Sequence, residues 1–123
     1  MLVQIVDDNK KFRETLLRFI APIADDIIEC SNGNEAVEAY AEHLPDFVLM
    51  DIKMPGMDGI TAAKIIVERF PDARIILITD LNQPLFLKEG KRAGALAYFS
   101  KENLEEVKEF ITNSIISKKK IEE

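Results

Sequence analysis

Five residues able to do chemistry stand at or just past the ends of short apolar segments that have the character of β-strands: Asp7, Asp8, Asp51, Thr79 and Lys101. In an open α/β sheet the carboxyl ends of the strands form a crevice in which ligands bind. Carboxylates gathered there without a cation raise one another's pKa, and a hard cation such as Mg²⁺ relieves that repulsion. The pattern therefore predicts an acidic magnesium site beside a threonine and a lysine.

Asp51 lies in the segment VLMDIKMPGMDG (48–59), where an apolar run meets an aspartate and then a turn rich in proline and glycine. The turn can offer the backbone carbonyl of Lys53 as a further oxygen ligand for Mg²⁺. A phosphoryl group entering this site meets the cation on one side and the Lys101 ammonium on another, which stabilises charge during transfer. Asp51 is therefore predicted to attack phosphorus and become an acyl phosphate.

Each of these residues, taken alone, also fits a structural role. The Asp7–Asp8 pair can cap a helix, Thr79 can be an ordinary strand residue, and Lys101 can be a solvated charge before a helix. The chemical interpretation is favoured because all of these residues stand at strand ends and because all of them are compatible with one reaction.

Length and composition bound the class of protein. The chain has 123 residues and 47% hydrophobic content, enough for one domain with a real core. A net charge of −6 disfavours direct binding to nucleic acid or anionic membranes. No basic leader and no apolar run of roughly 18 residues is present, so a cytoplasmic protein without a membrane span is expected. The single Cys30 cannot form an internal disulfide.

Strand and helix patterns alternate along the whole chain. Strands are expected at 2–6, 27–30, 47–50, 73–79 and 95–99. Helices are expected around 12–20, 37–44, 58–70, 84–94 and 104–116, where apolar residues recur at helical spacing. Such alternation indicates an α/β fold in which helices cover both faces of a parallel sheet. The most apolar strand, 47–50, is expected at its centre.

The expected helix between Pro84 and Gly94 is weaker than the others. Its interior Gly90 costs about 1 kcal/mol relative to alanine. The consecutive apolar residues at 85–87 cannot all face one core, so at least one is expected to be exposed. Scattered exposure and a partner surface on a mobile helix explain this equally well.

The sequence resembles a response-regulator receiver domain, the phospho-accepting switch of bacterial two-component signalling, over nearly its whole length. Four segments carry the resemblance: IVDDN (5–9), VLMDIKMPGMDG (48–59), IILIT (75–79) and GALAYFSK (94–101). The pattern DxxMPxMDG is highly specific when it follows an apolar strand. The resemblance implies a flavodoxin-like, doubly wound (βα)5 fold with strand order 2-1-3-4-5. It also implies a receiver domain at 1–117 and a polar tail or linker start at 118–123.

By this resemblance, Asp51 is the phosphorylation site, and a histidine kinase or phosphotransfer protein is the donor. Asp8, Asp51 and the Lys53 carbonyl would hold Mg²⁺, while Asp7 would act mainly through bound water. The resemblance implies a signalling domain with at most slow self-dephosphorylation, and not an enzyme.

The resemblance also implies how the switch works. Thr79 and Lys101 would bind phosphoryl oxygens, and Tyr98 would move inward when Thr79 moves toward the phosphate. This motion would remodel the face formed by the expected elements at 84–94, 95–99 and 104–116. That face is also a possible homodimer surface.

Two features depart from the usual pattern of the family. Asp80 stands where a small residue usually follows the switch threonine, and we expect it to slow phosphorylation or bias the switch. Glu102 follows Lys101 where many receivers have proline, and AYFSKENLEEV (97–107) is more similar to receivers that precede helix-turn-helix output domains. A transcriptional output domain outside this chain is therefore expected, with a stand-alone receiver as the alternative.

Three other functions compete with that of a phosphorylated receiver. A Mg²⁺-dependent aspartyl phosphatase usually has a second aspartate two residues after the nucleophile, where this chain has Lys53. A flavin-binding module needs a phosphate-cradling loop after the first strand, and DDNKK (7–11) has two acids and no glycine there. A receiver that binds partners without being phosphorylated stays open because of Asp80.

Overall fold

The computed structural model describes residues 1–80 and 84–122, with side chains up to Ile116. The five strands are β1 (Leu2–Val6), β2 (Asp26–Cys30), β3 (Phe47–Met50), β4 (Ile75–Thr79) and β5 (Ala97–Ser100). The helices in the described residues are α1 (Lys10–Ile20), α2 (Gly33–His43), α3 (Gly59–Arg69), α4 (Pro84–Ala93) and α5 (Leu104–Glu122). The predicted alternation of strands and helices is confirmed.

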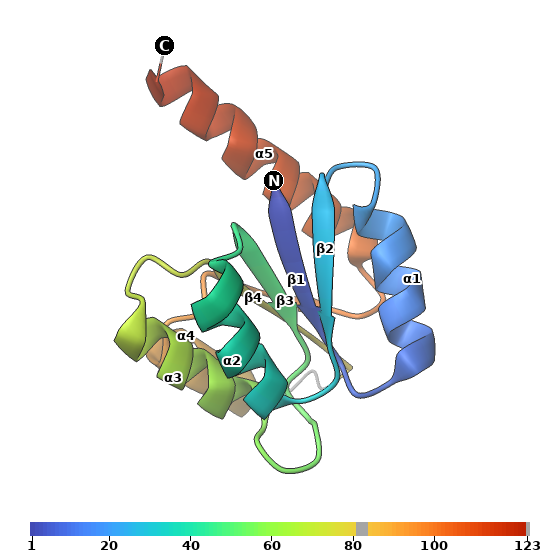
Figure 1. Ribbon diagram of the computed structural model, residues 1–123, viewed down its shortest axis with the longest axis vertical. Helices are drawn as coiled ribbons and strands as arrows, with labels where there is room; N and C mark the ends of the chain where they lie inside the picture. Colours follow the sequence, from blue (N-terminus) through green and yellow to red (C-terminus); the bar gives the residue numbers. More distant parts are fainter. Residues whose placement is uncertain (81–83, 123) are drawn as a thin grey trace.

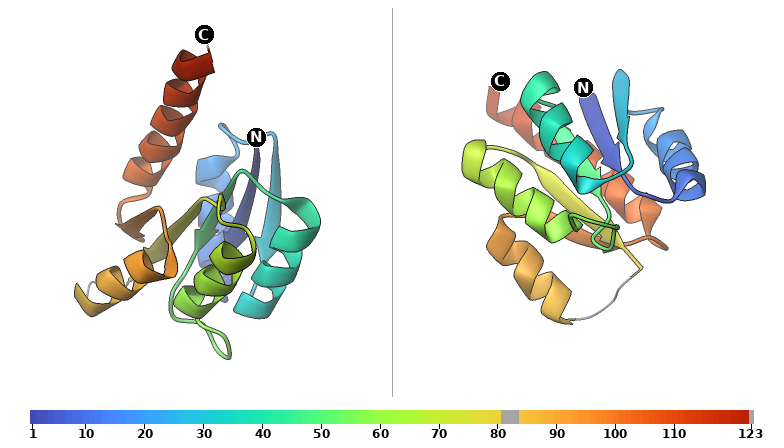
Figure 2. Two further views of the ribbon diagram at one scale, coloured as in Figure 1. Left: turned by 90° about the vertical axis from the view of Figure 1, so that its left-hand side faces the viewer. Right: turned by 60° about the horizontal axis from the view of Figure 1, so that its bottom comes forward.

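All strand pairs are parallel, and the order β2-β1-β3-β4-β5 confirms the predicted doubly wound topology. The predicted central strand, β3, lies in the middle of the sheet, and every residue in it is buried. Helices α1 and α5 cover one face, and α2, α3 and α4 cover the other (Figure 1; Figure 2). Each face has its own apolar core, because strand residues alternate between the two faces.

The end of α4 shifts the start of the last strand. Gly94 adopts a left-handed backbone conformation with φ of 98° and ends the helix. The backbone N–H of Ala95 then donates back to the carbonyl of Gly90 at 3.0 Å, so Ala95 belongs to the turn. The strand begins at Ala97, after this turn, so the predicted start at Ala95 is wrong.

Helix α5 continues beyond its predicted end at Ile116 to Glu122. Its C-terminal part runs past the sheet and away from the rest of the chain (Figures 1 and 2). The predicted polar tail at 118–123 falls partly on this helical backbone, and its side chains lie outside the described residues. The division into a domain at 1–117 and a tail stays a prediction.

The weak helix predicted at 84–94 is present as α4, and its apolar residues divide as expected. Leu85 and Leu87 are exposed by 59% and 43%, whereas Phe86 packs against the core. A Cβ atom on Gly90 would lie 2.8 Å from Cδ1 of Leu77 on β4. Glycine therefore allows α4 to approach the sheet closely at this point.

None of the helices in the described part of the chain has the length and apolarity of a membrane span.

Candidate functional site

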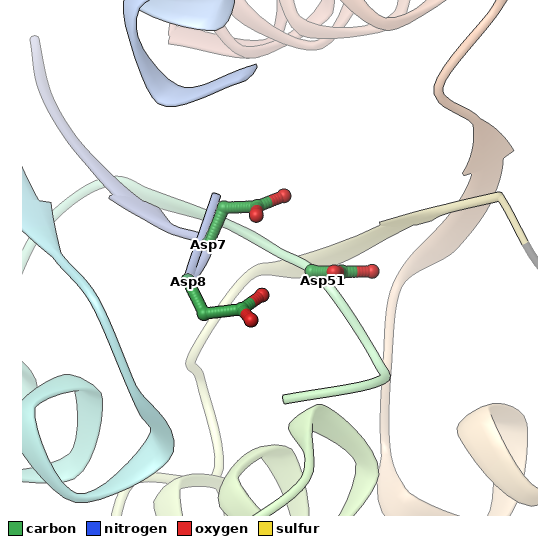
Figure 3. Close-up of side chains that lie close together, drawn as sticks. All are labelled: Asp7, Asp8 and Asp51. Carbon is green, nitrogen blue, oxygen red and sulfur yellow. The ribbon is translucent and has the colours of Figure 1, made fainter. Parts of the chain in front are cut away.

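Three carboxylates meet at the carboxyl ends of β1 and β3. Asp7 and Asp8 follow β1 and Asp51 follows β3, and these two strands are direct neighbours in the sheet. One oxygen from each carboxylate lies within 4.8 Å of the others. Figure 3 shows the Asp7 and Asp8 side chains directed toward the side of the site where Asp51 lies. The predicted acidic cluster is therefore present, with Asp7 and Asp51 buried and Asp8 exposed.

Hydrogen bonds from the backbone and from side chains hold the Asp7 segment in place. The N–H of Asp7 donates to the carbonyl of Cys30 at 3.1 Å, which ties it to β2. Oδ1 of Asp7 accepts from the N–H of Asn9 at 2.8 Å, and Asn9 is also the N-cap of α1. The Arg13 guanidinium on α1 donates to the Asp7 carbonyl at 2.7 Å. The start of α1 thus fixes the orientation of the first acid.

Asp51 is equally constrained. Its N–H donates to the Val6 carbonyl at 3.0 Å, and its Oδ1 accepts from the N–H of Ile52 at 2.8 Å. The turn that follows folds back on the strand, because the N–H of Gly59 donates to the Ile52 carbonyl at 2.7 Å. A Cβ atom on Gly59 would lie 1.9 Å from the carbonyl oxygen of Asp51, so this approach requires glycine. Asp58 caps α3, as predicted, by accepting from the N–H of Thr61.

Lys101 brings a positive charge into the acidic cluster. Its Nζ atom lies 2.8 Å from Oδ2 of Asp7 and 3.3 Å from Oδ2 of Asp51. Its side chain is only 12% exposed. The backbone N–H of Lys101 donates to the carbonyl of Thr79 at 3.1 Å, which keeps the chain after β5 close to β4. The predicted convergence of these strand ends is confirmed for the three acids and the lysine.

The buried charged groups shift one another's pKa. Burial raises the pKa of Asp51, the negative charge of Asp7 adds to this rise, and the Lys101 ammonium partly offsets it. Burial by itself lowers the pKa of Lys101, but its hydrogen bond to Asp7 and the charge of Asp51 outweigh that cost and raise it. The ammonium therefore stays charged, and it supplies the positive charge that the carboxylates need.

The remaining predicted residues lie at the end of β4, on β5 and in the turn after Asp51. Thr79 is the last residue of β4 and is buried, and Asp80, which follows it, is exposed. Tyr98 lies half-buried on β5, and its pKa is raised by burial and by the negative charge of Asp51. Lys53 is exposed in the turn after Asp51.

The donor set suits a hard divalent cation. Carboxylate oxygens are the ligands that Mg²⁺ prefers, and Asp8 presents an exposed carboxylate beside two buried ones. Oδ2 of Asp7 is buried and has the Lys101 ammonium as its partner at 2.8 Å. Three carboxylates beside one ammonium leave net negative charge at the site, which a bound cation would offset.

Four residues that support the site were not predicted as site residues: Asn9, Phe12, Arg13 and Gly59. Asn9 could have been found, because asparagine directly before an amphipathic helix is a common N-cap. Helical spacing places Phe12 on the apolar face of its helix and gives no reason to expect a contact with Lys101. Its contact with Lys101 joins α1 to the segment after β5, which is distant in the sequence, so no local signal predicts it.

The sequence model of the response regulator receiver domain matches residues 3–112. The chain belongs to this family. This receiver domain is 41% identical over 101 residues to the transcriptional regulatory protein YhcZ of Bacillus subtilis, covering 80% of the chain and 47% of YhcZ. It is 39% identical over 100 residues to the chemotaxis protein CheY of the same organism, covering 80% of the chain and 83% of CheY.

Solved structures show the same fold as this receiver domain. A LuxR-family two-component response regulator from Aurantimonas has a TM-score of 0.86 at 29% identity, over 94% of this chain and 85% of the other. CheY of Borrelia burgdorferi, in a complex with CheX, BeF₃ and Mg²⁺, has a TM-score of 0.84 at 30% identity, over 94% and 89%. The chain spans about half the length of its transcriptional-regulator relatives, so it corresponds to their receiver part.

Proposed function

We propose that this receiver domain accepts a phosphoryl group on Asp51 from a histidine kinase or phosphotransfer protein, and that phosphorylation controls an output. The observation that carries the proposal is the burial of Asp51 together with the partners of its two carboxylate oxygens. The residue is 7% exposed, one carboxylate oxygen accepts from a backbone N–H, and the other faces the Lys101 ammonium. A buried, oriented carboxylate beside a cation is the arrangement that a phosphoryl acceptor needs.

The transfer is a displacement at phosphorus. An oxygen of Asp51 attacks the phosphorus of a phosphohistidine, the P–N bond breaks, and its electron pair leaves with the imidazole nitrogen, which takes a proton. The Ile52 N–H orients the Asp51 carboxylate before attack. The Lys101 ammonium and the Thr79 hydroxyl are proposed to bind phosphoryl oxygens, which stabilises the charge that they carry during transfer.

Mg²⁺ is the proposed cofactor. Asp8, Asp51 and the backbone carbonyl of Lys53 would hold the ion, and Asp7 would act mainly through bound water. When bound, the cation would neutralise charge on the phosphoryl oxygens. The acidic cluster supports this assignment.

The proposed output surface is the face formed by α4, β5 and α5. Three exposed leucines, Leu85 and Leu87 on α4 and Leu96 before β5, belong to this region of the chain. We propose that Thr79 and Tyr98 move together on phosphorylation and change this face, which then binds a second copy or another partner. The transcriptional relatives support an output domain that binds DNA in a longer protein. The receiver domain itself is proposed to make no direct contact with nucleic acid.

The test is phosphorylation by acetyl phosphate, followed by intact-protein mass spectrometry. Labelling is expected in the wild type with Mg²⁺, and it should disappear with EDTA or in Asp51→Asn. A parallel titration with beryllofluoride and Mg²⁺, followed by NMR, should shift signals from Asp51 through Thr79 and Tyr98 to α4. The CheY complex that contains BeF₃ supports the choice of this adduct.

These two measurements, together with an assay of phosphate release, separate the alternative functions. Absence of labelling together with an unchanged spectrum would favour a receiver that binds partners without phosphorylation. Continuous phosphate release from a panel of phosphomonoesters, far above background, would instead indicate an aspartyl phosphatase.

A further inference from the structure

The Lys101 ammonium has an aromatic neighbour that the proposed chemistry does not use. Its Nζ atom lies 4.3 Å from the centroid of the Phe12 ring. A cation over an aromatic face at this distance is attracted by the electron-rich face of the ring. Lys101 therefore has partners on three sides: the carboxylates of Asp7 and Asp51, and the ring of Phe12.

Phe12 is itself tied to the acidic cluster. Oδ1 of Asp7 accepts from the N–H of Asn9 at 2.8 Å, and Oδ1 of Asn9 accepts from the N–H of Phe12 at 3.0 Å. The Phe12 ring then contacts Lys101, whose Nζ returns to Oδ2 of Asp7 at 2.8 Å. Asp7, Asn9, Phe12 and Lys101 are therefore linked to one another in a ring of contacts. The hydrogen bonds that start at Asp7 thus hold the backbone of Phe12, and the Phe12 ring lies against the ammonium.

The contact with the Phe12 ring matters for the position of the Lys101 ammonium, because a lysine side chain is flexible. Its charged group sits on a four-carbon stem and is strongly hydrated, so solvent competes for it. Asp8 is exposed at the same rim and offers another carboxylate nearer to water. The ring of Phe12 disfavours such excursions, since it attracts the ammonium and also excludes water from one side of it.

We propose that Phe12 is a positioning residue, which holds the Lys101 ammonium between Asp7 and Asp51 and thereby sets the rate at which Asp51 is phosphorylated. The inference rests on the proposed phosphorylation of Asp51. It deepens that function by assigning a role to a residue that otherwise belongs to the packing of α1 against the sheet.

Phe12→Leu removes the aromatic face and keeps an apolar side chain, whereas Phe12→Tyr keeps both. Phe19→Leu is the matched control, because Phe19 lies on the same helix, is also half-buried and packs on the same core. Far-UV circular dichroism and thermal unfolding should show that all three variants fold.

The first measurement needs no phosphorylation. In the wild type, NMR signals of the Lys101 side-chain protons should be shifted upfield by the Phe12 ring. The shift should persist in Phe12→Tyr and Phe19→Leu and vanish in Phe12→Leu. Persistence of the shift in Phe12→Leu would overturn the proposed contact.

The second measurement is the saturating rate of labelling by acetyl phosphate with Mg²⁺. Phe12→Leu should be slower by about fivefold, the size of one cation–π contact. Phe12→Tyr and Phe19→Leu should keep the wild-type rate. In a Lys101→Met background the Phe12→Leu change should have no further effect, because the group through which it acts is gone.

The outcomes distinguish the two proposals. Suppose that the wild type is labelled and that the effects of Phe12→Leu and Lys101→Met on the labelling rate multiply. Phe12 would then affect the rate through core packing and not through Lys101. This inference would be wrong, while the proposed function would stand. If wild type is not labelled by any phosphodonor, the proposed function fails, and with it the claim about rate. The NMR shift then decides whether Phe12 positions Lys101.

Discussion

Nζ of Lys101 lies 3.3 Å from a carboxylate oxygen of Asp51, although the two residues follow strands that are separated in the sheet by β4. The same nitrogen lies 2.8 Å from Asp7. The acidic cluster is thus partly neutralised by the protein's own cation. Because the charges share this small volume, substitutions among them should not have independent effects.

Asp51→Asn should abolish labelling and also stabilise the fold at neutral pH. The raised pKa of Asp51 means that its charged form is costly in the folded state. This cost is complete above the folded-state pKa and absent below the ordinary aspartate pKa. The variant should therefore gain roughly 1 kcal/mol at pH 7, within the usual range of single substitutions, and the gain should shrink toward acidic pH.

Urea unfolding at a series of pH values measures this difference. Asp72→Asn, at an exposed aspartate before β4, serves as the control and should change stability little. A fold that is equally or less stable in Asp51→Asn at neutral pH would contradict the account of the buried charge.

Lys101→Met should destabilise the fold by about 2 kcal/mol, because it leaves two carboxylates at the site without their cation. Added Mg²⁺ should restore part of this loss, since it brings positive charge to the same acids. Thermal unfolding with Mg²⁺ and with EDTA measures both effects. Lys88→Met, at an exposed position on α4, should show neither; a similar response to Mg²⁺ in both variants would argue against a site at these acids.

Gly59→Ala should disrupt the turn after Asp51, and Gly56→Ala should be tolerated better. The new Cβ at position 59 would lie 1.9 Å from the backbone carbonyl oxygen of Asp51, so the turn has to move. At Gly56 nothing lies within 4 Å, and only the positive φ of 78° opposes alanine. We expect a loss of about 3 kcal/mol for the first variant and about 1 kcal/mol for the second.

Labelling by acetyl phosphate provides the functional comparison for these glycines. It should fall sharply in Gly59→Ala and stay near wild type in Gly56→Ala. Equal stability and equal labelling of the two variants would show that the close approach at Gly59 does not shape the site.

Asp80→Ala should increase the rate or the plateau of labelling by about two- to fivefold, the scale of one exposed charge acting at close range. The reason is that Asp80 adds negative charge directly after Thr79, near the place proposed for an incoming phosphoryl group. Asp72→Ala makes the same charge change before β4, at the opposite end of that strand, and should have no effect. Equal rates and equal plateaus for Asp80→Ala and wild type would refute a modulating role for Asp80.

The sequence alone was sufficient to predict the parallel sheet, its central strand, the cap at Asp58 and the gathering of acids at one rim. These features follow from local patterns. Apolar runs and helical spacing identify the elements, and alternation of strands with helices leaves few possible topologies. Once β1 and β3 are neighbours, residues directly after them must lie close together.

Only the tertiary structure decided the distances and burial on which the chemistry depends. That Asp7 is buried while its neighbour Asp8 is exposed, and that Lys101 contacts both Asp7 and Phe12, depends on how α1 and the end of β5 pack at the rim. The same holds for the approach of Gly59 to Asp51. A local pattern specifies an element, but contacts between distant segments depend on strand register, sheet twist and the packing of helices, which the whole chain determines together.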